Sequence, residues 1–437
     1  MAAFRVLESI HSEGKTLLDA APSIEDHCHD ARDRGLARDI AFGACRWKER
    51  IRHILQQAAP RLDNFPPAVQ IILEMSVYQM LYLDRVPDYA VISEAVDLTR
   101  TQRFGGLAPA VNGILRAVSR TRDNVSFPEP AKDFASYLST VHSHPKWLVD
   151  QWLNIWPKER VESFCRFNNT IAPLSLRVRI ERLAALEKLE KMGFKAEADR
   201  RFADRILLQA NGASLQELFK ESDWVAQDGA AMLIAPILDP QPGWRIWDVS
   251  AAPGGKTTHL SDLTENKAQI LASDNHAERL KKIEEQKTKL GLTNVSIQKI
   301  DARRKQPLLE KEPFDAILVD APCSGWGTFR RHPDLRWRLQ REDSQRFARQ
   351  ALQILENVQL YLKPDGVLVY GTCTLSPEEN EQLIAALIER HPEFQIEPVK
   401  EFLPSAFQEA QTEDGYLFVF PADWDMDGSF AARLRKS

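Results

Sequence analysis

Long apolar stretches are absent from the sequence. None of its 437 residues lies in a run that approaches the roughly 18 to 20 apolar residues needed to cross a membrane. The N-terminal segment MAAFRVLESIHSEGK places charges among its apolar residues, so it lacks the apolar core of a signal peptide. We therefore expect a cytoplasmic protein that has no membrane partner.

Cysteine is scarce, and its distribution excludes a disulfide framework. The five cysteines are scattered and odd in number: Cys28, Cys45, Cys165, Cys323 and Cys373. Free thiols with a chemistry of their own remain open. The cluster His27-Cys28-His29 has no second Cys/His pair at the spacing of a zinc finger, so we expect a solvated loop there and no metal site.

A large excess of charge of either sign is also lacking. The net charge of −5 neither favours nor excludes a nucleic-acid partner, because a local basic patch matters more than the total. The length, in contrast, predicts two or three domains.

The first 125 residues show only helical patterns. Residues 69–83 are apolar on most faces and predict a buried central helix, and Pro87 and the Gly105–Gly106 pair separate the helices around it. We predict an all-α domain over residues 1–125. A linker over residues 126–143, with Pro128 and Pro130, should follow it.

The remaining chain mixes strands and helices. Residues 144–224 surround the strand-like LSLRVRI with helical patterns and predict a small α/β subdomain. From residue 225 to residue 437 strand-like and helical runs alternate, which predicts a doubly wound α/β sheet. Ligands of such a sheet bind outside the carboxyl ends of its strands.

Polar side chains or thiols stand at five predicted strand ends: Ser250, Asp274, Asp301, Asp320 and Cys373. The first lies in DVSAAPGGKTT, a strand–turn–helix pattern whose glycines allow close backbone approach and whose helix start favours an anion. The spacing matches neither GxGxxG nor the phosphate loop. Asp274, about 20 residues further on, suits a ribose, and Asp301 suits an adenine. Either aspartate alone could also be an ordinary strand-end or helix-capping residue.

The first cysteine motif is DAPCSGWGTFRRHPDLRW, residues 320–337, in which Cys323 lies in a Pro-Cys-Ser-Gly turn. Basic and aromatic residues follow, and together they suit phosphate contacts and base stacking: Arg330, Arg331, Arg336 and Trp337. The alternative is a surface loop with a solvated charge run.

The second cysteine motif is YGTCTLSPEENE, residues 370–381. Ser376 and Glu379 have the spacing of a capping box, with Pro377 at the first helical position. Cys373 could be a small buried apolar side chain. Two thiols at the ligand edge of one sheet nevertheless favour covalent chemistry.

These motifs resemble those of known families. AAPGGKT, DAPCSGWG and YGTCTLSPEENE, with VAQDGAA and DGSFAARL, are similar to the RNA cytosine-5 methyltransferases of the Sun/RsmB type. AFGACRWKERI, YQMLYLDRVPDYAVISEAV and VNGILRAV resemble the NusB family of RNA-binding helical domains. In that helical domain Arg46 and Arg116 are candidate phosphate contacts, beside Arg50, Arg52 and Arg120. The combination points to the bacterial small-subunit rRNA branch.

The resemblance implies three domains. They are an all-α NusB-like domain (1–125), a small α/β, RRM-like RNA-binding subdomain (144–224) and a Rossmann-like methyltransferase domain (225–437) that depends on S-adenosylmethionine. We expect a monomer that methylates carbon 5 of a cytidine in 16S rRNA.

The resemblance also implies roles for single residues. The cofactor contacts would be Ser250, Ala251, Ala252, Pro253, Gly254, Gly255, Lys256, Asp274, Asp301 and Asp320. Cys373 would add to carbon 6 of the base, Cys323 would assist release, and Asp320 would hydrogen-bond ring nitrogen 3. Two residues depart from the family: Ser250 stands in place of a cysteine, and Arg179 in place of an asparagine, which leaves open how the subdomain touches RNA.

Four other interpretations remain at this point. The same chemistry could act on tRNA, or Cys323 could be the nucleophile, as in DNA cytosine methyltransferases. The chain could instead be a non-catalytic RNA-binding or assembly protein, or a small-molecule methyltransferase. Separate substitution of the two cysteines and a test of cofactor binding would distinguish them.

Overall fold

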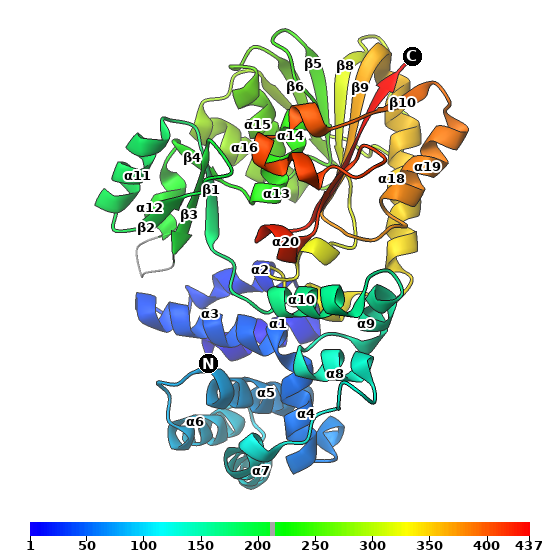
Figure 1. The fold of residues 1–437 in the computed structure, drawn as a ribbon. Coiled ribbons are helices and arrows are strands. Elements are labelled where there is room, and N and C mark those ends of the chain that lie inside the picture. Colours follow the sequence, from blue (N-terminus) through cyan, green and yellow to red (C-terminus); the bar gives the residue numbers. More distant parts are fainter. Residues whose placement is uncertain (210–214) are drawn as a thin grey trace. The chain divides into compact units, whose positions relative to one another are not determined.

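The computed structural model describes residues 1–209 and 215–437, which form two compact units (Figure 1). Unit 1 comprises Met1–Ile171 and Phe329–Arg341. Unit 2 comprises Ala172–Thr328 and Glu342–Ser437. The chain therefore leaves unit 2 for thirteen residues and then returns to it.

Unit 1 contains helices and no strand among its described residues. Its α-helices are α1 (Ala2–Glu13), α2 (Leu17–Ala20), α3 (Ala31–Arg46), α4 (Lys48–Ala58), α5 (Pro67–Tyr82), α6 (Asp88–Thr101), α7 (Ala108–Thr121), α8 (Phe134–Val141), α9 (Lys146–Leu153), α10 (Lys158–Asn168) and α17 (Leu335–Arg338). Helix α5 contacts α1, α3, α4, α6 and α7, and it buries Val69, Ile72 and Val77 completely. It is the predicted central helix, and the all-α character of the N-terminal domain is confirmed.

The structure divides the chain at a different place from the sequence-based prediction. The predicted linker, residues 126–143, contains α8, which packs against α4 and α9. Helices α9 and α10 belong to unit 1, so the two compact units divide after Ile171. Leu148, Trp152 and Phe164 are fully buried, and helices with such apolar faces need a core to cover them.

Unit 2 begins with a small antiparallel sheet of order β2-β3-β1-β4. Its elements are β1 (Leu174–Val178), α11 (Arg182–Lys191), β2 (Lys195–Ala198), β3 (Arg205–Gln209), α12 (Leu215–Lys220) and β4 (Trp224–Ala226). Leu176, Leu189, Ile206 and Trp224 form its buried core. The small α/β subdomain is thus present.

The main sheet of unit 2 has eight strands among the described residues, in the order β10-β12-β9-β8-β5-β6-β7, with β11 paired to β12. Its elements are α13 (Gly229–Met232), α14 (Ile234–Ile237), β5 (Arg245–Val249), α15 (Gly255–Leu263), β6 (Gln269–Asp274), α16 (Ala277–Leu290), β7 (Val295–Lys299), β8 (Phe314–Asp320), α18 (Asp343–Val358), β9 (Leu362–Thr372), α19 (Glu381–Arg390), β10 (Phe394–Glu397), β11 (Leu417–Val419), α20 (Pro421–Trp424) and β12 (Ser429–Lys436). Strands β7, β6, β5, β8 and β9 run parallel, and β12 is antiparallel to β9.

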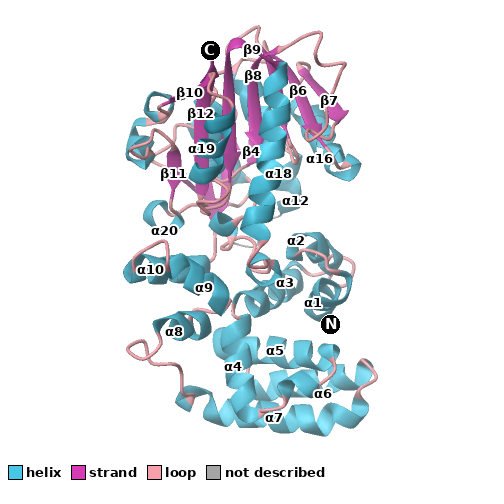
Figure 2. Ribbon diagram, turned by 90° about the vertical axis from the view of Figure 1, so that its right-hand side faces the viewer, coloured by secondary structure: helices cyan, strands magenta, loops and turns pink. Residues whose placement is uncertain are grey.

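Helices cover both faces of this sheet. Successive side chains of a strand point to opposite faces. Val367 and Val369 of β9 therefore pack into the core that contains α14, α15 and α16, whereas Leu368 and Tyr370 pack with α18 and α19. Figure 2 shows α18 and α19 in front of the strands.

The order of the strands also locates the ligand edge of the sheet. Winding proceeds from β5 to β6 and β7 in one direction and from β8 to β9 in the other. A crevice is expected where the direction reverses, outside the carboxyl ends of β5 and β8. Over residues 1–209 and 215–437, no helix is both long and apolar enough to span a membrane.

Candidate active site

The turn between β5 and α15 lies at the carboxyl end of β5, at the ligand edge of the sheet. Gly254, the N-cap of α15, has a φ of +104°, and no described side chain caps the helix. Ser250 also adopts a positive φ, of +58°, and the Ala252–Pro253 peptide bond is cis. The N–H of Ala251 donates to Ser273 O of β6 at 2.8 Å, which ties the turn to the neighbouring strand.

A buried carboxyl group in β5 stabilises this turn. Asp248, in β5, is fully buried, and Thr257 Oγ1 of α15 donates to its Oδ2 at 2.6 Å. Burial raises the pKa of Asp248 to about 7. The contact joins the end of β5 to the first turn of α15. An acidic residue between the apolar residues Trp247 and Val249 was the available sequence signal, but sequence analysis gave Asp248 no role.

Asp274, at the end of β6, has an unused acceptor atom. Its Oδ1 accepts a hydrogen bond from the N–H of His276 at 3.0 Å. Its buried Oδ2 accepts none from any described residue, although Arg279 Nη1 forms an ion pair with it at 3.2 Å. Unsatisfied buried acceptors are rare in folded proteins. The ribose of S-adenosylmethionine would supply the missing hydroxyl donor, so the residues of this edge fit that cofactor.

Asp301, which follows β7, is occupied within the protein. Arg303 Nε and Nη2 lie 2.8 and 2.9 Å from its two carboxylate oxygens. The hydrogen bond from Arg303 lowers the pKa of Asp301. Asp301 therefore has less capacity left for an adenine than Asp274 has for a ribose.

Lys256 and Asp320 join the β5–α15 turn to the first cysteine motif. Lys256 Nζ in α15 lies 2.7 Å from Asp320 Oδ2 at the end of β8. Burial acts to lower the pKa of Lys256, but the charge and hydrogen bond of Asp320 outweigh it and raise this pKa, with a smaller contribution from Cys373. The lysine ammonium thus neutralises the Asp320 carboxylate.

The two cysteines of the sequence motifs meet at this edge. Cys323 Sγ and Cys373 Sγ are 3.3 Å apart, and Cys373 is the more exposed of the two. The hydrogen bond to Cys373, followed by burial, raises the pKa of Cys323 well above its ordinary value. Cys323 therefore retains its proton and can donate a hydrogen bond to Cys373 Sγ.

The predicted capping box of the second motif is wrong. Helix α19 begins at Glu381, and the Ser376 hydroxyl binds Glu378 Oε2 at 2.7 Å. Glu379 does not reach back to Ser376 with its side chain but accepts hydrogen bonds from Ser324 of the first cysteine motif. Sequence analysis missed this role because the local spacing has an ordinary structural interpretation.

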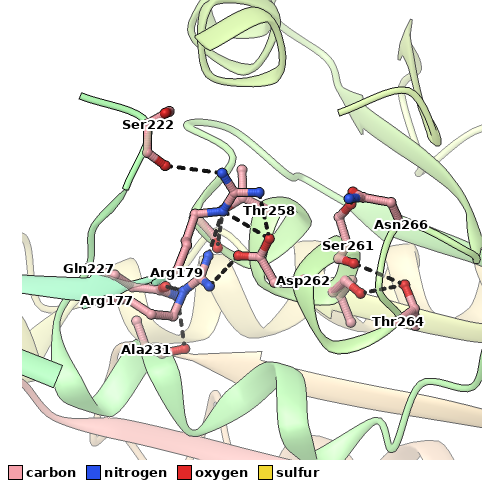
Figure 3. Close-up of polar contacts among 12 residues, drawn as sticks. Arg177, Arg179, Ser222, Gln227, Ala231, Thr258, Ser261, Asp262, Thr264 and Asn266 are labelled. Atoms are coloured by element: carbon pink, nitrogen blue, oxygen red, sulfur yellow. Dashed lines mark hydrogen bonds and ion pairs between the residues drawn. The ribbon is translucent and has the colours of Figure 1, made fainter. Parts of the chain in front are cut away.

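A second polar cluster ties the small sheet to α15 (Figure 3). Arg177 of β1 donates to Gln227 Oε1, Thr258 Oγ1 and Asp262 Oδ2 at 2.8, 3.1 and 2.5 Å. Arg179, the residue that departs from the family, donates to Asp262 Oδ1 at 3.0 Å and to Ser222 O at 3.1 Å. The family departure thus makes an internal contact to the helix that follows the cofactor turn.

The structure contradicts some of the RNA contacts predicted for the segment after Cys323. Arg336 is fully buried in unit 1, where its Nη atoms contact Ser143 O, Asn168 O and His144 Nε2 at 3.0–3.1 Å. Burial, followed by the charge of Arg46, lowers the pKa of Arg336 to about 9. Arg330 is buried over the ring of Phe167.

Two further predicted RNA contacts belong to the same packing. Arg46 is buried and donates to Arg330 O at 3.0 Å, and half-buried Trp337 donates to Cys45 O at 2.7 Å. A buried guanidinium that binds protein carbonyls is not available to a phosphate. We therefore withdraw the direct RNA contacts predicted for Arg46, Arg330 and Arg336. Arg331 is half-buried.

Arg116 differs from this group because it is exposed. It lines a surface groove of about 780 Å³ between α6 and α7, together with Arg100, Arg120 and the exposed ring of Tyr89. Arg116 Nε donates to Asn112 Oδ1 at 3.1 Å. Asp88, the acidic residue of the groove, is paired with Arg122. The groove is therefore positively charged.

Within the described part of the chain, no three His, Cys, Asp or Glu side chains come together in a way that could hold a metal ion.

Comparison with known proteins gives consistent matches for all three parts of the chain. The family described as 16S rRNA methyltransferase RsmB/F matches residues 235–435, the NusB family matches residues 1–120, and the ferredoxin-like domain of RsmF/B-like methyltransferases matches residues 144–214. These matches confirm the predicted fold class.

Individual proteins are similar over almost the whole length. The probable ribosomal RNA small subunit methyltransferase B of Bacillus subtilis is 34% identical, with 93% of this chain and 91% of the relative covered. Its counterpart in Synechocystis is 32% identical, with 100% and 98% covered. The crystal structure of the protein PH0851 superimposes with a TM-score of 0.85 at 25% identity and covers 100% of this chain and 98% of that one. On this similarity, the chain belongs to the RsmB/F family of 16S rRNA methyltransferases.

Proposed function

We propose that this protein transfers a methyl group from S-adenosylmethionine to carbon 5 of a cytidine in 16S rRNA, with Cys373 as the nucleophile. The observation that carries the proposal is the 3.3 Å separation of the Cys323 and Cys373 sulfurs, at the sheet edge that also bears the cofactor turn. The family membership and the names of the relatives support an rRNA substrate.

The cofactor site would use the β5–α15 turn and two strand ends. The backbone of residues 250–256 would contact the amino-acid part, and Asp274 Oδ2 would accept a ribose hydroxyl. Asp301 would lie near the adenine. The cofactor, when bound, supplies a methyl group on a positively charged sulfur.

Cys373 and Asp320 would activate the base. Carbon 5 of cytosine is a weak nucleophile, and addition of the Cys373 thiolate to carbon 6 makes it electron-rich. Ring nitrogen 3 takes up a proton from water as the adduct forms and donates a hydrogen bond to the Asp320 carboxylate, which stabilises the adduct. Lys256 holds this carboxylate in place at 2.7 Å. The base must lie outside a helical stack for the thiol to reach carbon 6.

Cys323 would act in release. After methylation a base takes the proton from carbon 5, the electron pair of that C–H bond restores the C5–C6 double bond, and the C6–sulfur bond to Cys373 breaks. The Cys323 thiol donates a hydrogen bond to the departing Cys373 sulfur and so assists this step. The different environments of the two thiols support this division of roles, because Cys373 is exposed whereas Cys323 is half-buried and has the raised pKa.

The groove between α6 and α7 of unit 1 would also hold RNA. Arg100, Arg116 and Arg120 would contact phosphates, and the exposed ring of Tyr89 would offer a surface for base stacking. This groove replaces the buried arginines as the RNA contact of the helical unit.

The test is transfer of labelled methyl from S-adenosylmethionine to naked 16S rRNA and, separately, to bulk tRNA. We expect label in 16S rRNA with the unaltered protein and none with Cys373→Ala. Cys323→Ala should instead accumulate an RNA–protein adduct that survives denaturation, since addition proceeds and release fails.

Each other outcome has a definite meaning. Label in tRNA alone would identify tRNA as the substrate and leave the proposed reaction unchanged. Turnover by Cys373→Ala combined with its loss in Cys323→Ala would exchange the two roles. Absence of both methyl transfer and S-adenosylmethionine binding would favour a non-catalytic RNA-binding protein.

A further inference from the structure

We propose that Glu379 and Asn380 are positioning residues that hold the loops of Cys323 and Cys373 against each other and so keep the two sulfurs in contact. The inference rests on the proposed function only in assigning a use to the two thiols. Both cysteine loops and the two positioning residues lie in unit 2.

Glu379 holds the loop of Cys323. Its Oε2 accepts the backbone N–H of Ser324 at 2.8 Å, and its Oε1 lies 2.5 Å from the Ser324 hydroxyl. Both residues are buried. A two-point contact of this kind fixes the orientation of the peptide that follows Cys323, as a bidentate carboxylate does elsewhere.

Asn380 holds the loop of Cys373 from both sides. Its Oδ1 accepts the hydroxyl of Thr372 at 2.7 Å, and its Nδ2 donates to the carbonyl of Thr374 at 3.0 Å. Thr372 and Thr374 are the two neighbours of Cys373 in the sequence. The amide is fully buried and uses both of its ends, so it fits this position better than a carboxylate or an apolar side chain would.

Two direct bonds complete the connection between the loops. Ser324 Oγ lies 2.7 Å from Thr374 Oγ1, and the N–H of Gly327 donates to Cys373 O at 3.0 Å. The hydroxyl of Tyr370 donates to the backbone carbonyl of Glu379 at 2.7 Å, which attaches the pair to strand β9. Adjacent residues in one buried segment thus contact both cysteine loops.

The protonation state of Glu379 leaves the contact intact. Burial raises the pKa of Glu379 to about 7, against hydrogen bonds from Ser324 and Ser344 that lower it, and the neighbouring Glu378 raises it further. The ionised carboxylate accepts from the Ser324 hydroxyl, whereas the protonated acid can donate to it. Glutamine offers the same acceptor and donor, so Glu379→Gln should preserve the contact.

The experiment measures how readily the two thiols form a disulfide in the full-length protein. Diamide removes two hydrogens from a pair of adjacent thiols and is itself reduced to the hydrazine, and peptide mass mapping without reductant reports the Cys323–Cys373 bond. We expect Glu379→Ala and Asn380→Ala to form it about tenfold or more slowly, because misplacement by about 1 Å costs about two powers of ten in reactions of positioned groups.

Matched variants separate positioning from general damage. Glu379→Gln should react within about twofold of the unaltered protein, and so should Glu378→Ala, which removes the adjacent carboxylate that does not contact Ser324. If Glu379→Ala loses its cooperative melting transition, Ser324→Ala takes its place, because it removes only the hydroxyl that joins Glu379 to Thr374. It should also slow the reaction several-fold.

Methyl transfer provides the second measurement. Glu379→Ala should lower kcat by about 10- to 100-fold with an unchanged KM for S-adenosylmethionine, and Glu379→Gln should restore most of it. Disulfide formation at the unaltered rate in folded Glu379→Ala or Ser324→Ala would overturn the inference. Slow disulfide formation in a protein that methylates no RNA would uphold the positioning role and refute only the proposed function.

Discussion

Two aspartates that end neighbouring strands differ in how much of their hydrogen-bonding capacity the protein itself uses. Asp274 Oδ2 is buried without a hydrogen bond from any described residue, whereas both oxygens of Asp301 are bound by Arg303. A ligand hydroxyl should therefore stabilise the complex more at Asp274 than at Asp301. It would give Asp274 Oδ2 a hydrogen bond in addition to the ion pair with Arg279, whereas both oxygens of Asp301 already accept from Arg303.

This difference predicts unequal effects on cofactor affinity. Asp274→Asn should weaken binding of S-adenosylmethionine by about tenfold or more, because a hydrogen bond to a charged group is worth about 1.5–3 kcal/mol. Asp301→Asn should weaken binding by less than about threefold. Isothermal titration calorimetry measures both. Equal losses, or a larger loss with Asp301→Asn, would contradict the assignment.

Single residues could be predicted from the sequence where a strand end identified them. Strand ends meet at one edge of a parallel sheet, so the positions of Asp274, Asp320 and Cys373 in the sequence sufficed to group them. Arg336 could not be assigned in this way. Basic residues beside aromatic ones suit RNA and suit a buried cluster equally well, and only tertiary packing decides between the two.

At the scale of elements, β1 and α15 are joined by charge. Arg177 of β1 is almost completely buried, and its three guanidinium nitrogens donate hydrogen bonds to Gln227, Thr258 and Asp262. The contact fixes the small sheet to the helix whose first turn would face the cofactor. Loss of Arg177 would leave the buried oxygens of Gln227 and Thr258 without this donor, whereas Asp262 would keep its contact with Arg179.

Arg177→Met should therefore destabilise unit 2 by about 2–3 kcal/mol, because a buried acceptor left without its donor costs about 1–3 kcal/mol. Arg179→Ala should cost about 1 kcal/mol or less, because Arg177 still neutralises Asp262 in that variant. Urea unfolding followed by circular dichroism gives both values. A smaller loss for Arg177→Met than for Arg179→Ala would show that the buried contact is not the stronger of the two.

The order and type of elements followed from periodicity more reliably than their ends did. The alternation of strands and helices after residue 225 predicted the doubly wound sheet. The motif at residues 376–379 predicted a helix start, but α19 begins only at Glu381. Glu379 of that motif accepts a hydrogen bond from Ser324, 55 residues away in the sequence, and no local sequence pattern indicates such a partner.

At the scale of the whole molecule, unit 1 is assembled from two separate stretches of the chain. Residues 329–341 pack there through Phe329, Arg336 and Trp337, whereas the residues on either side belong to unit 2. A cut at the predicted linker, residues 126–143, would therefore not separate two complete domains.

This arrangement predicts the behaviour of shortened chains. Residues 172–437 alone should be poorly soluble, because Phe329 and Trp337 lose the helices that cover them. The same chain should become soluble and bind S-adenosylmethionine when residues 329–341 are replaced by a glycine–serine linker of equal length. Soluble yield and calorimetry measure this. Equal yields of the two chains would show that the segment needs no cover.

The discontinuity of unit 1 also fixes an order of events during synthesis. Its last piece ends at Arg341, 170 residues after Ile171, and a ribosome that adds about 5–20 residues per second needs about 10–35 s to reach it. Strands β5, β6, β7 and β8 emerge within that interval. Unit 1 therefore cannot bury Arg336 until most strands of the parallel sheet of unit 2 have been synthesised, although most of unit 1 comes first in the chain.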